Sequence, residues 1–220
     1  LHGALIANPN NPNGTMMVPD AFKSLINTSN ELGITFISDE IYHGLTFDVK
    51  EETALKYSDQ AIIINSFSKY FCMTGWRIGW MIVPEHLVET VNRLQQNAFI
   101  CAPEISQIAA LHAFDGLDEL EATKASYKEN RDLLLAELPK LGFREIQPVD
   151  GAFYVYANCS QLSNDSEAFC QDILNHAKTA ITPGTDFDTK RGKAWVRFSF
   201  AGSKADMKNG LQRLGDYLKR

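Results

Sequence analysis

The chain has 220 residues, of which 45% are hydrophobic and 22% are charged, and its formal net charge is −6. This composition is ordinary for a globular protein. No Lys/Arg cluster is dense enough for a nucleic-acid or anionic-membrane surface, and no apolar run approaches the roughly 20 residues that span a bilayer. The four cysteines form no CxxC pair and the five histidines no HxxxH pair. We therefore expect no metal site, no nucleic-acid or membrane partner, and the reduced thiols of a cytoplasmic protein.

The first part of the chain is expected to alternate strands with a helix. A short apolar run at residues 5–7 ends in segment 8–14, which is rich in the turn-forming residues Asn, Pro and Gly. Pro19 and Gly33 flank a segment with helical spacing of apolar residues, and they suit the first turn and the end of a helix. Three bounded apolar runs then predict buried strands at residues 34–38, 61–65 and 76–83. Such strands, separated by helices, indicate a largely parallel sheet covered on both faces.

The middle of the chain is expected to be helical. Stripes of apolar residues predict one helix after Pro84, a second over residues 103–114 and a third over residues 117–138. The third is long and heavily charged, as expected of a helix that bridges two domains.

Beyond Gly142 the pattern changes to short strands mixed with helices. The expected strands are at residues 143–146, 152–157 and 195–200, and the expected helices are at residues 166–177 and 204–219. We therefore predict an α/β domain over residues 1–122 and a smaller α+β domain over residues 123–220.

Three polar motifs lie where predicted strands end, and open α/β sheets bind ligands at the carboxyl ends of their strands. They are the turn NPNNPNG at residues 8–14, SDEIY at residues 38–42, and SFSK at residues 66–69 with MTGWRIGW at residues 73–80. Each alone has an ordinary structural explanation, since a strand-terminal Asp often caps a helix and a lysine after a turn is usually exposed. Their order and spacing along one chain are what favour a functional interpretation.

Together these motifs resemble the signature of class I/II aminotransferases, the aspartate-aminotransferase-like enzymes of fold type I that use pyridoxal 5′-phosphate (PLP). One position departs from the pattern, because Asn13 stands where the family usually has Thr, and Asn suits a turn. The resemblance implies an α/β fold, with a partial large domain built on a mostly parallel sheet and a smaller α+β domain at the carboxyl end. It covers essentially the whole chain, which opens as if in the middle of a domain. We therefore expect the carboxyl-terminal part of such an enzyme, lacking the amino-terminal part.

The resemblance also implies roles for the residues that match the motifs. Lys69 forms the Schiff base with the cofactor and later moves a proton as general acid/base, which requires a neutral amine. Asp39 pairs with the pyridine nitrogen, so that the ring can take up electrons. Asn11 and Tyr42 hydrogen-bond the phenolic oxygen of the cofactor.

Two arginines are implied to bind anions. Arg77 holds the cofactor phosphate with the hydroxyls of Ser66 and Ser68, because a guanidinium fork suits a phosphate. Arg197, in the predicted strand at residues 195–200, matches the family arginine that binds the substrate α-carboxylate.

The implied activity is transfer of an amino group between an amino acid and a 2-oxo acid by a homodimer. A PLP-dependent C–S β-lyase shares the fold and the lysine, although the MTGWRIG segment favours the transferase. A third alternative is a non-catalytic PLP-fold effector module of a transcription regulator, which requires a basic DNA-binding domain upstream. The sequence does not indicate which amino donor is used.

Overall fold

The computed structural model describes residues 1–219, which form two compact units. Unit 1 comprises residues 1–10 and 16–122, and unit 2 comprises residues 11–15 and 123–219. The chain passes from one unit to the other within the long helix α4 (Leu117–Glu137). Among the described residues, no helix has both the length and the apolar sequence that a bilayer span requires.

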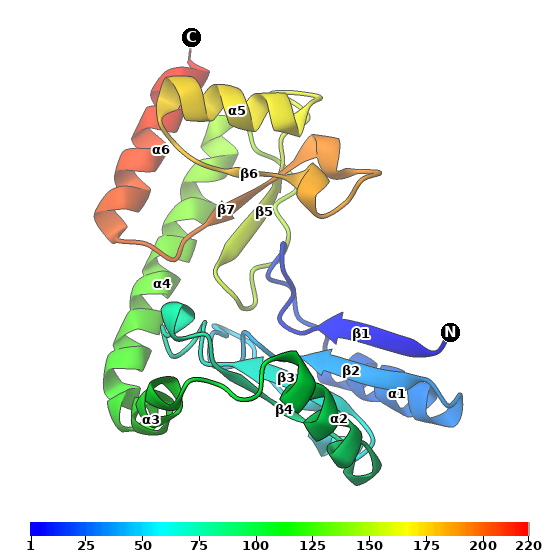
Figure 1. Cartoon of the computed structure of the whole chain (residues 1–220). Coiled ribbons are helices and arrows are strands. Elements are labelled where there is room, and N and C mark those ends of the chain that lie inside the picture. The colour runs from blue at the N-terminus through cyan, green and yellow to red at the C-terminus, as the bar shows by residue number, and fades with distance from the viewer. Residues whose placement is uncertain (220) are drawn as a thin grey trace. The chain divides into compact units, whose positions relative to one another are not determined.

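Unit 1 contains a four-stranded sheet with the strand order β1-β2-β3-β4 (Figure 1). Its strands are β1 (Gly3–Ala7), β2 (Thr35–Asp39), β3 (Ile62–Ser66) and β4 (Gly79–Ile82). β2 pairs in parallel with both β1 and β3, whereas β4 runs antiparallel to β3. The prediction of a mostly parallel sheet is therefore confirmed, with one antiparallel strand at its edge.

The last strand of unit 1 is shorter than the run predicted at residues 76–83. A 3₁₀ turn, Thr74–Trp76, precedes it. Arg77 follows in the left-handed conformation, with φ 52° and ψ 48°. A strand cannot run through that backbone geometry, so β4 begins only at Gly79.

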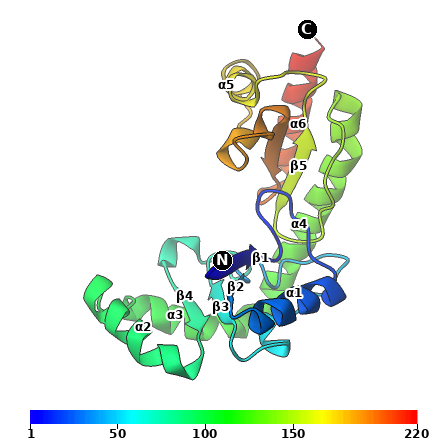
Figure 2. The same cartoon turned by 90° about the vertical axis from the view of Figure 1, so that its right-hand side faces the viewer.

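Helix α1 (Pro19–Glu31) packs on the sheet of unit 1, beside β2 in Figure 2. Its limits follow the predicted signals, because Pro19 occupies the first turn and Gly33, with φ +65°, follows its end. The side chains that α1 buries join those of β2 and β3 in the core of the unit. This core consists of Phe22, Ile26, Phe36, Ala54, Ala61 and Ile63.

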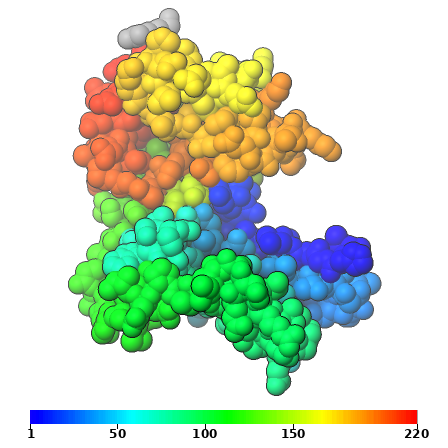
Figure 3. Space-filling view, viewed as in Figure 1, coloured from blue at the N-terminus to red at the C-terminus, as the bar shows by residue number. Residues whose placement is uncertain are grey.

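Helices α2 (Glu85–Ala98) and α3 (Glu104–His112) complete unit 1 and appear in green, facing the viewer, in Figure 3. The described residues leave much apolar surface open here, since every residue of β4 is exposed and Leu111 of α3 is 70% exposed. At the other edge of the sheet, Leu5 of β1 is 60% exposed. The expectation of a sheet covered on both faces is therefore wrong for residues 1–219.

Unit 2 is built on a three-stranded antiparallel sheet with the order β5-β7-β6. Its elements are β5 (Tyr154–Asn158), α5 (Ser166–Ala177), β6 (Thr182–Pro183), β7 (Trp195–Ser199) and α6 (Lys204–Leu218). Its core contains fully buried side chains from the sheet, the helices and the segment before β5, including Leu138, Phe143, Val155, Ile173, Val196, Phe200 and Leu214. The turn at residues 11–15 belongs to this unit because the amides of Asp150 and Gly151 donate to the carbonyl of Gly14 at 3.0 and 2.9 Å.

One predicted strand, at residues 143–146, does not form. Only an isolated bridge between Arg144 and Asn158 is present there. Glu145 takes the left-handed conformation, with φ 47°, and this interrupts the ladder. The two-residue strand β6 was not predicted, since it is too short to show a periodic pattern.

Within residues 1–219, six 3₁₀ turns connect these elements. They are Ala54–Lys56, Thr74–Trp76, Ala113–Gly116, Leu138–Leu141, Gly184–Asp186 and Gly192–Ala194.

Candidate active site

The polar motifs of unit 1 meet at one edge of its sheet. The parallel strands β2 and β3 both end there, with Asp39 of β2 paired in register with Ile64 of β3. The antiparallel strand β4 begins at the same edge, where Gly79 pairs with Ser66. Residues 66–79, which leave β3 and return as β4, therefore carry their side chains to the strand end that bears Asp39.

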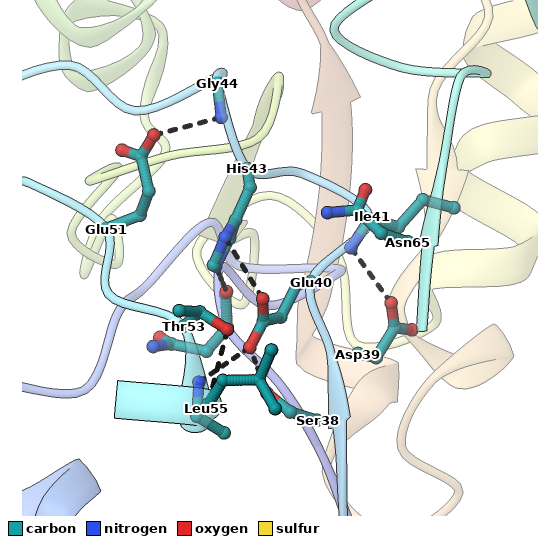
Figure 4. A network of polar contacts seen from close by, with 12 residues as sticks. Ser38, Asp39, Glu40, Ile41, His43, Gly44, Glu51, Thr53, Leu55 and Asn65 are labelled. Carbon is teal, nitrogen blue, oxygen red and sulfur yellow. Dashed lines mark hydrogen bonds and ion pairs between the residues drawn. The ribbon is translucent and has the colours of Figure 1, made fainter. Parts of the chain in front are cut away.

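Asp39 is the last residue of β2, and its side chain shapes the turn that follows (Figure 4). Its Oδ1 accepts a hydrogen bond from the Ile41 N–H at 3.1 Å. Its Oδ2 makes no hydrogen bond to residues 1–219, and so this oxygen can accept a hydrogen bond from a donor outside the chain. Tyr42 follows in the same turn and is 4% exposed.

The buried carboxylate of Glu40 holds this turn in place. Its Oε1 accepts from the Ser38 hydroxyl at 3.0 Å and from the Ala54 N–H at 2.8 Å. The imidazole of His43 lies 3.4 Å from its Oε2 and 3.1 Å from the carbonyl of Asn8, so it joins the turn to the end of β1 (Figure 4). Glu40 has no role among the sequence-predicted site residues. Its position inside the SDEIY motif gave no signal that its carboxylate is buried.

Lys69 lies on the loop between β3 and β4, with its Nζ 5.8 Å from the centre of the Tyr42 ring. The backbone of this loop is closed by two hydrogen bonds, from Cys72 N–H to Lys69 O and from Met73 N–H to Phe67 O, both 3.1 Å. Aromatic contacts also hold the loop, because Phe71 contacts both Phe67 and Phe114 with ring centres 4.8 and 5.1 Å apart. The lysine therefore projects from a loop whose backbone is well defined.

Two hydroxyls and a guanidinium come from residues close to this lysine in the sequence. They lie at the same end of the strands. The hydroxyls of Ser66 and Ser68 are 2.9 Å apart, and the Ser68 N–H donates to Ser66 Oγ at 3.0 Å. Arg77 Nη1 donates to the carbonyl of Thr74 at 2.9 Å, and the Thr74 hydroxyl donates to the carbonyl of Ser68 at 2.8 Å. Through Thr74, Arg77 is linked to the backbone of Ser68. The set can bind an anion through hydrogen bonds that are charge-assisted.

Arg197 occupies the central strand of the sheet in unit 2, where its guanidinium lies between two rings. Its Cζ is 4.3 Å from the centre of the Tyr154 ring and 4.7 Å from that of Phe187. Nη1 donates to Asn11 Oδ1 at 2.8 Å, and Nη2 donates to Thr182 Oγ1 at 3.3 Å. Nε is buried and makes no hydrogen bond to any described residue.

The structure places the sequence-predicted site residues in two groups, one in each unit. Asp39, Tyr42, Ser66, Ser68, Lys69 and Arg77 gather at one sheet edge of unit 1, and Asn11 and Arg197 meet in unit 2. The partners of Arg197 were missed, since Tyr154, Phe187 and Thr182 come from three separate segments and show no common pattern in the sequence.

The comparisons with known proteins bear on both groups. The family model for aminotransferase class I and II matches residues 2–214. The chain belongs to this family. It is 44% identical to the valine–pyruvate aminotransferase of Mycobacterium tuberculosis, over 99% of this chain and 57% of that protein.

Solved structures give the same family and the fold. A crystal structure of an aminotransferase from Mycobacterium tuberculosis superposes with a TM-score of 0.96 at 44% identity, covering 100% of this chain and 58% of that one. The aspartate aminotransferase of Thermotoga maritima superposes with a TM-score of 0.89 at 31% identity, covering 99% and 56%. The chain thus spans little more than half the length of the family members that it matches. The predicted fold class, that of the fold-type I aminotransferases, is confirmed.

Proposed function

We propose that the protein is a PLP-dependent aminotransferase, which exchanges an amino group between an amino acid and a 2-oxo acid. The observation that supports this most strongly is the arrangement at the sheet edge of unit 1. There a lysine amine, a strand-terminal carboxylate and an anion-binding set of hydroxyls and guanidinium converge. Family membership supports the same activity.

The donor set of unit 1 fits PLP group by group. Ser66, Ser68 and Arg77 supply neutral and charged donors for a phosphate. Asp39 has an oxygen that the turn does not use, and a carboxylate there can accept the N–H of a pyridinium ring. Tyr42 brings a phenol within reach of Lys69. PLP supplies an electron sink when it is bound.

Lys69 then has two tasks in this proposal. Its Nζ would hold the cofactor at its aldehyde carbon, with the amine as nucleophile. The same Nζ would take up and return the proton of the substrate Cα, as a general base and acid. A loop position suits this second task, since the amine must change partners during one turnover.

Arg197 is proposed to bind the substrate α-carboxylate. The two rings and the hydrogen bonds to Asn11 and Thr182 fix the guanidinium before any substrate arrives. Its buried Nε lacks a partner among residues 1–219, as expected for a donor that awaits an external acceptor. Asn11 accepts from Arg197 with its Oδ1, and its amide group is a donor suited to the phenolic oxygen of the cofactor.

The substrate pair and the cellular setting are also proposals. Valine and pyruvate are the first pair to test, because a valine–pyruvate aminotransferase is 44% identical to the chain. We place the protein in the cytoplasm, which the four free cysteines support. We expect a homodimer, and the exposed apolar side chains of α2, α3 and β4 support burial against further protein.

The decisive experiment is reduction of the protein with borohydride after incubation with PLP, followed by mass mapping. We expect a phosphopyridoxyl group on Lys69 and none on Lys140, an exposed lysine of unit 2 that serves as the internal control. The Lys69→Ala variant should lose this label and all transamination. Labelling spread over many lysines in the wild type would contradict the proposal. Release of pyruvate and sulfide without an oxo-acid acceptor would instead indicate the C–S β-lyase.

A further inference from the structure

Tyr70 stands next to Lys69 and contacts two other segments of unit 1. Its ring packs edge-on against Phe71 of its own loop, with the ring centres 5.1 Å apart. The same ring lies against the backbone of Gly44, and its hydroxyl reaches helix α4. None of the roles proposed above uses this residue.

The contact with Gly44 requires the glycine. A Cβ at that position would lie 2.4 Å from Tyr70 Cγ and 2.5 Å from Cδ2, closer than side-chain atoms can approach. The backbone of Gly44 is also left-handed, with φ +89°. Gly44 is two residues after Tyr42, whose ring faces the Lys69 amine. The Tyr70 ring is therefore the direct contact between the loop that bears Lys69 and the turn that bears Tyr42.

The hydroxyl of Tyr70 fixes the orientation of its ring. It donates to Glu121 Oε1 on α4 at 2.6 Å. Burial and this hydrogen bond raise the pKa of Tyr70 to about 12, so the hydroxyl remains a donor at any ordinary pH. The Gly44 side of the contact is also fixed, because the Gly44 N–H donates to Glu51 Oε1 at 3.2 Å (Figure 4).

We propose that Tyr70 is a positioning residue, whose ring sets the spacing between the Lys69 loop and the Tyr42 turn and so places the Lys69 amine at the cofactor. This inference rests on the proposed function of Lys69. The aromatic ring is the part that does the positioning, and the hydrogen bond to Glu121 holds that ring against Gly44.

The test compares variants of Tyr70 with variants of Tyr57, the matched control. Tyr57 lies in the same unit but outside the lysine loop, donates to a glutamate (Glu52) and packs on Phe22 of α1. Two readouts are needed: the rate at which PLP and borohydride label Lys69, and the hydrogen exchange of the Cys72 and Met73 amides without PLP. The second readout reports on the loop even when no cofactor binds.

We expect Tyr70→Ala to slow the labelling of Lys69 at least about tenfold, because small misplacements of a reacting group are costly. The amides of Cys72 and Met73 should exchange faster in the same variant. Tyr70→Phe keeps the ring and should remain within about fivefold of the wild type, having lost a single hydrogen bond. Gly44→Ala should behave like Tyr70→Ala, since its methyl group displaces the ring.

Tyr57→Ala should leave both readouts unchanged relative to the wild type. Wild-type labelling in Tyr70→Ala, or equal losses in Tyr57→Ala, would overturn the inference. If Tyr70→Ala fails to fold, Tyr70→Leu replaces it, with the same loss expected because the flat ring is gone. A wild type that does not label Lys69 would refute the proposed function instead, and the amide exchange would still decide whether Tyr70 orders the loop.

Discussion

Arg197 lies on the central strand of an antiparallel sheet, held between two rings, whereas Lys69 lies on a loop that leaves the end of β3. Hydrogen bonds from Nη1 and Nη2 and contacts with two rings fix the guanidinium, whereas Nε makes no hydrogen bond to a described residue. The amine is fixed mainly through the backbone of its loop and the rings around it. This difference suits the tasks that we propose, since a carboxylate-binding group gains from rigidity while a proton-transferring amine must move.

The two units also differ in how completely they bury their large apolar side chains. Of the large apolar side chains that are exposed among residues 1–219, only Leu174 comes from unit 2. All the others belong to unit 1, and many lie on β4, α2 and α3. Unit 2 therefore buries its apolar surface within the described chain. Unit 1 leaves a face that further protein must cover if its stability is to match that of unit 2.

The largest expected effect tests this contrast with one substitution at two places. Phe143→Ala removes a fully buried ring of unit 2 and should cost ~3–5 kcal/mol of unfolding free energy. Phe99→Ala removes a ring of unit 1 that is 63% exposed and should change it by less than about 0.5 kcal/mol. Urea unfolding measures both. The fluorescence of Trp195 reports on unit 2 in a background that lacks Trp76 and Trp80, and the fluorescence of Trp76 and Trp80 reports on unit 1 in a background that lacks Trp195. Equal shifts would contradict the difference between the cores.

The next effect concerns the rigid arginine. Arg197→Lys keeps the charge but loses the planar fork, and we expect substrate affinity to fall by the ~1.5–3 kcal/mol of a hydrogen bond to a charged group. The substrate KM measures this change, and the labelling of Lys69 by PLP should stay the same. Arg191→Lys is the control, because Arg191 is exposed and pairs only with its neighbour Asp188 in the described structure. A lost cofactor with intact substrate affinity would refute the role of Arg197.

Local signals in the sequence predicted the elements well. Pro19 and Gly33 gave the limits of α1, and the ends of the apolar runs gave the strands whose edge bears Asp39 and Lys69. Two failures arose where the backbone takes left-handed conformations at residues other than glycine. Arg77 delays β4 and Glu145 removes a predicted strand, and neither residue type announces such a conformation.

The same distinction between local signals and long-range contacts applies to the candidate site. Residues that belong to a local motif were predicted to lie at a strand end, and the structure places the motifs of Asp39 and Lys69 there. Residues that act through long-range packing were missed: the rings beside Arg197, and the pair of Gly44 and Tyr70, depend on contacts between distant segments. The catalytic and binding roles of the predicted site residues remain predictions until the labelling and affinity experiments are done.

The smallest expected effect lies in the turn that faces the lysine loop. Glu51 accepts hydrogen bonds from the Gly44 N–H and from the Thr46 hydroxyl. Burial raises the pKa of Glu51, but the bonds from Thr46, from its own N–H and from Gly44 outweigh it and hold the pKa below the ordinary 4.5. A carboxyl group with a lowered pKa in the folded state stabilises that state above its unfolded pKa. This contribution is lost as the pH falls through the folded value.

Acidification from above the ordinary pKa of 4.5 to below the lowered pKa of the folded state should therefore loosen this turn, at a cost of about 1 kcal/mol, the usual contribution of one hydrogen bond. The protection of the Gly44 amide against hydrogen exchange, corrected for the intrinsic effect of pH, measures the loss. Glu51→Gln should show weaker protection at neutral pH and no acid-dependent step. Thr46→Val removes the donor that most lowers the pKa and should move the step to higher pH. A step at the wild-type pH in Thr46→Val would mean that another group controls the turn, and the fixed Gly44 surface on which Tyr70 rests would then need a different origin.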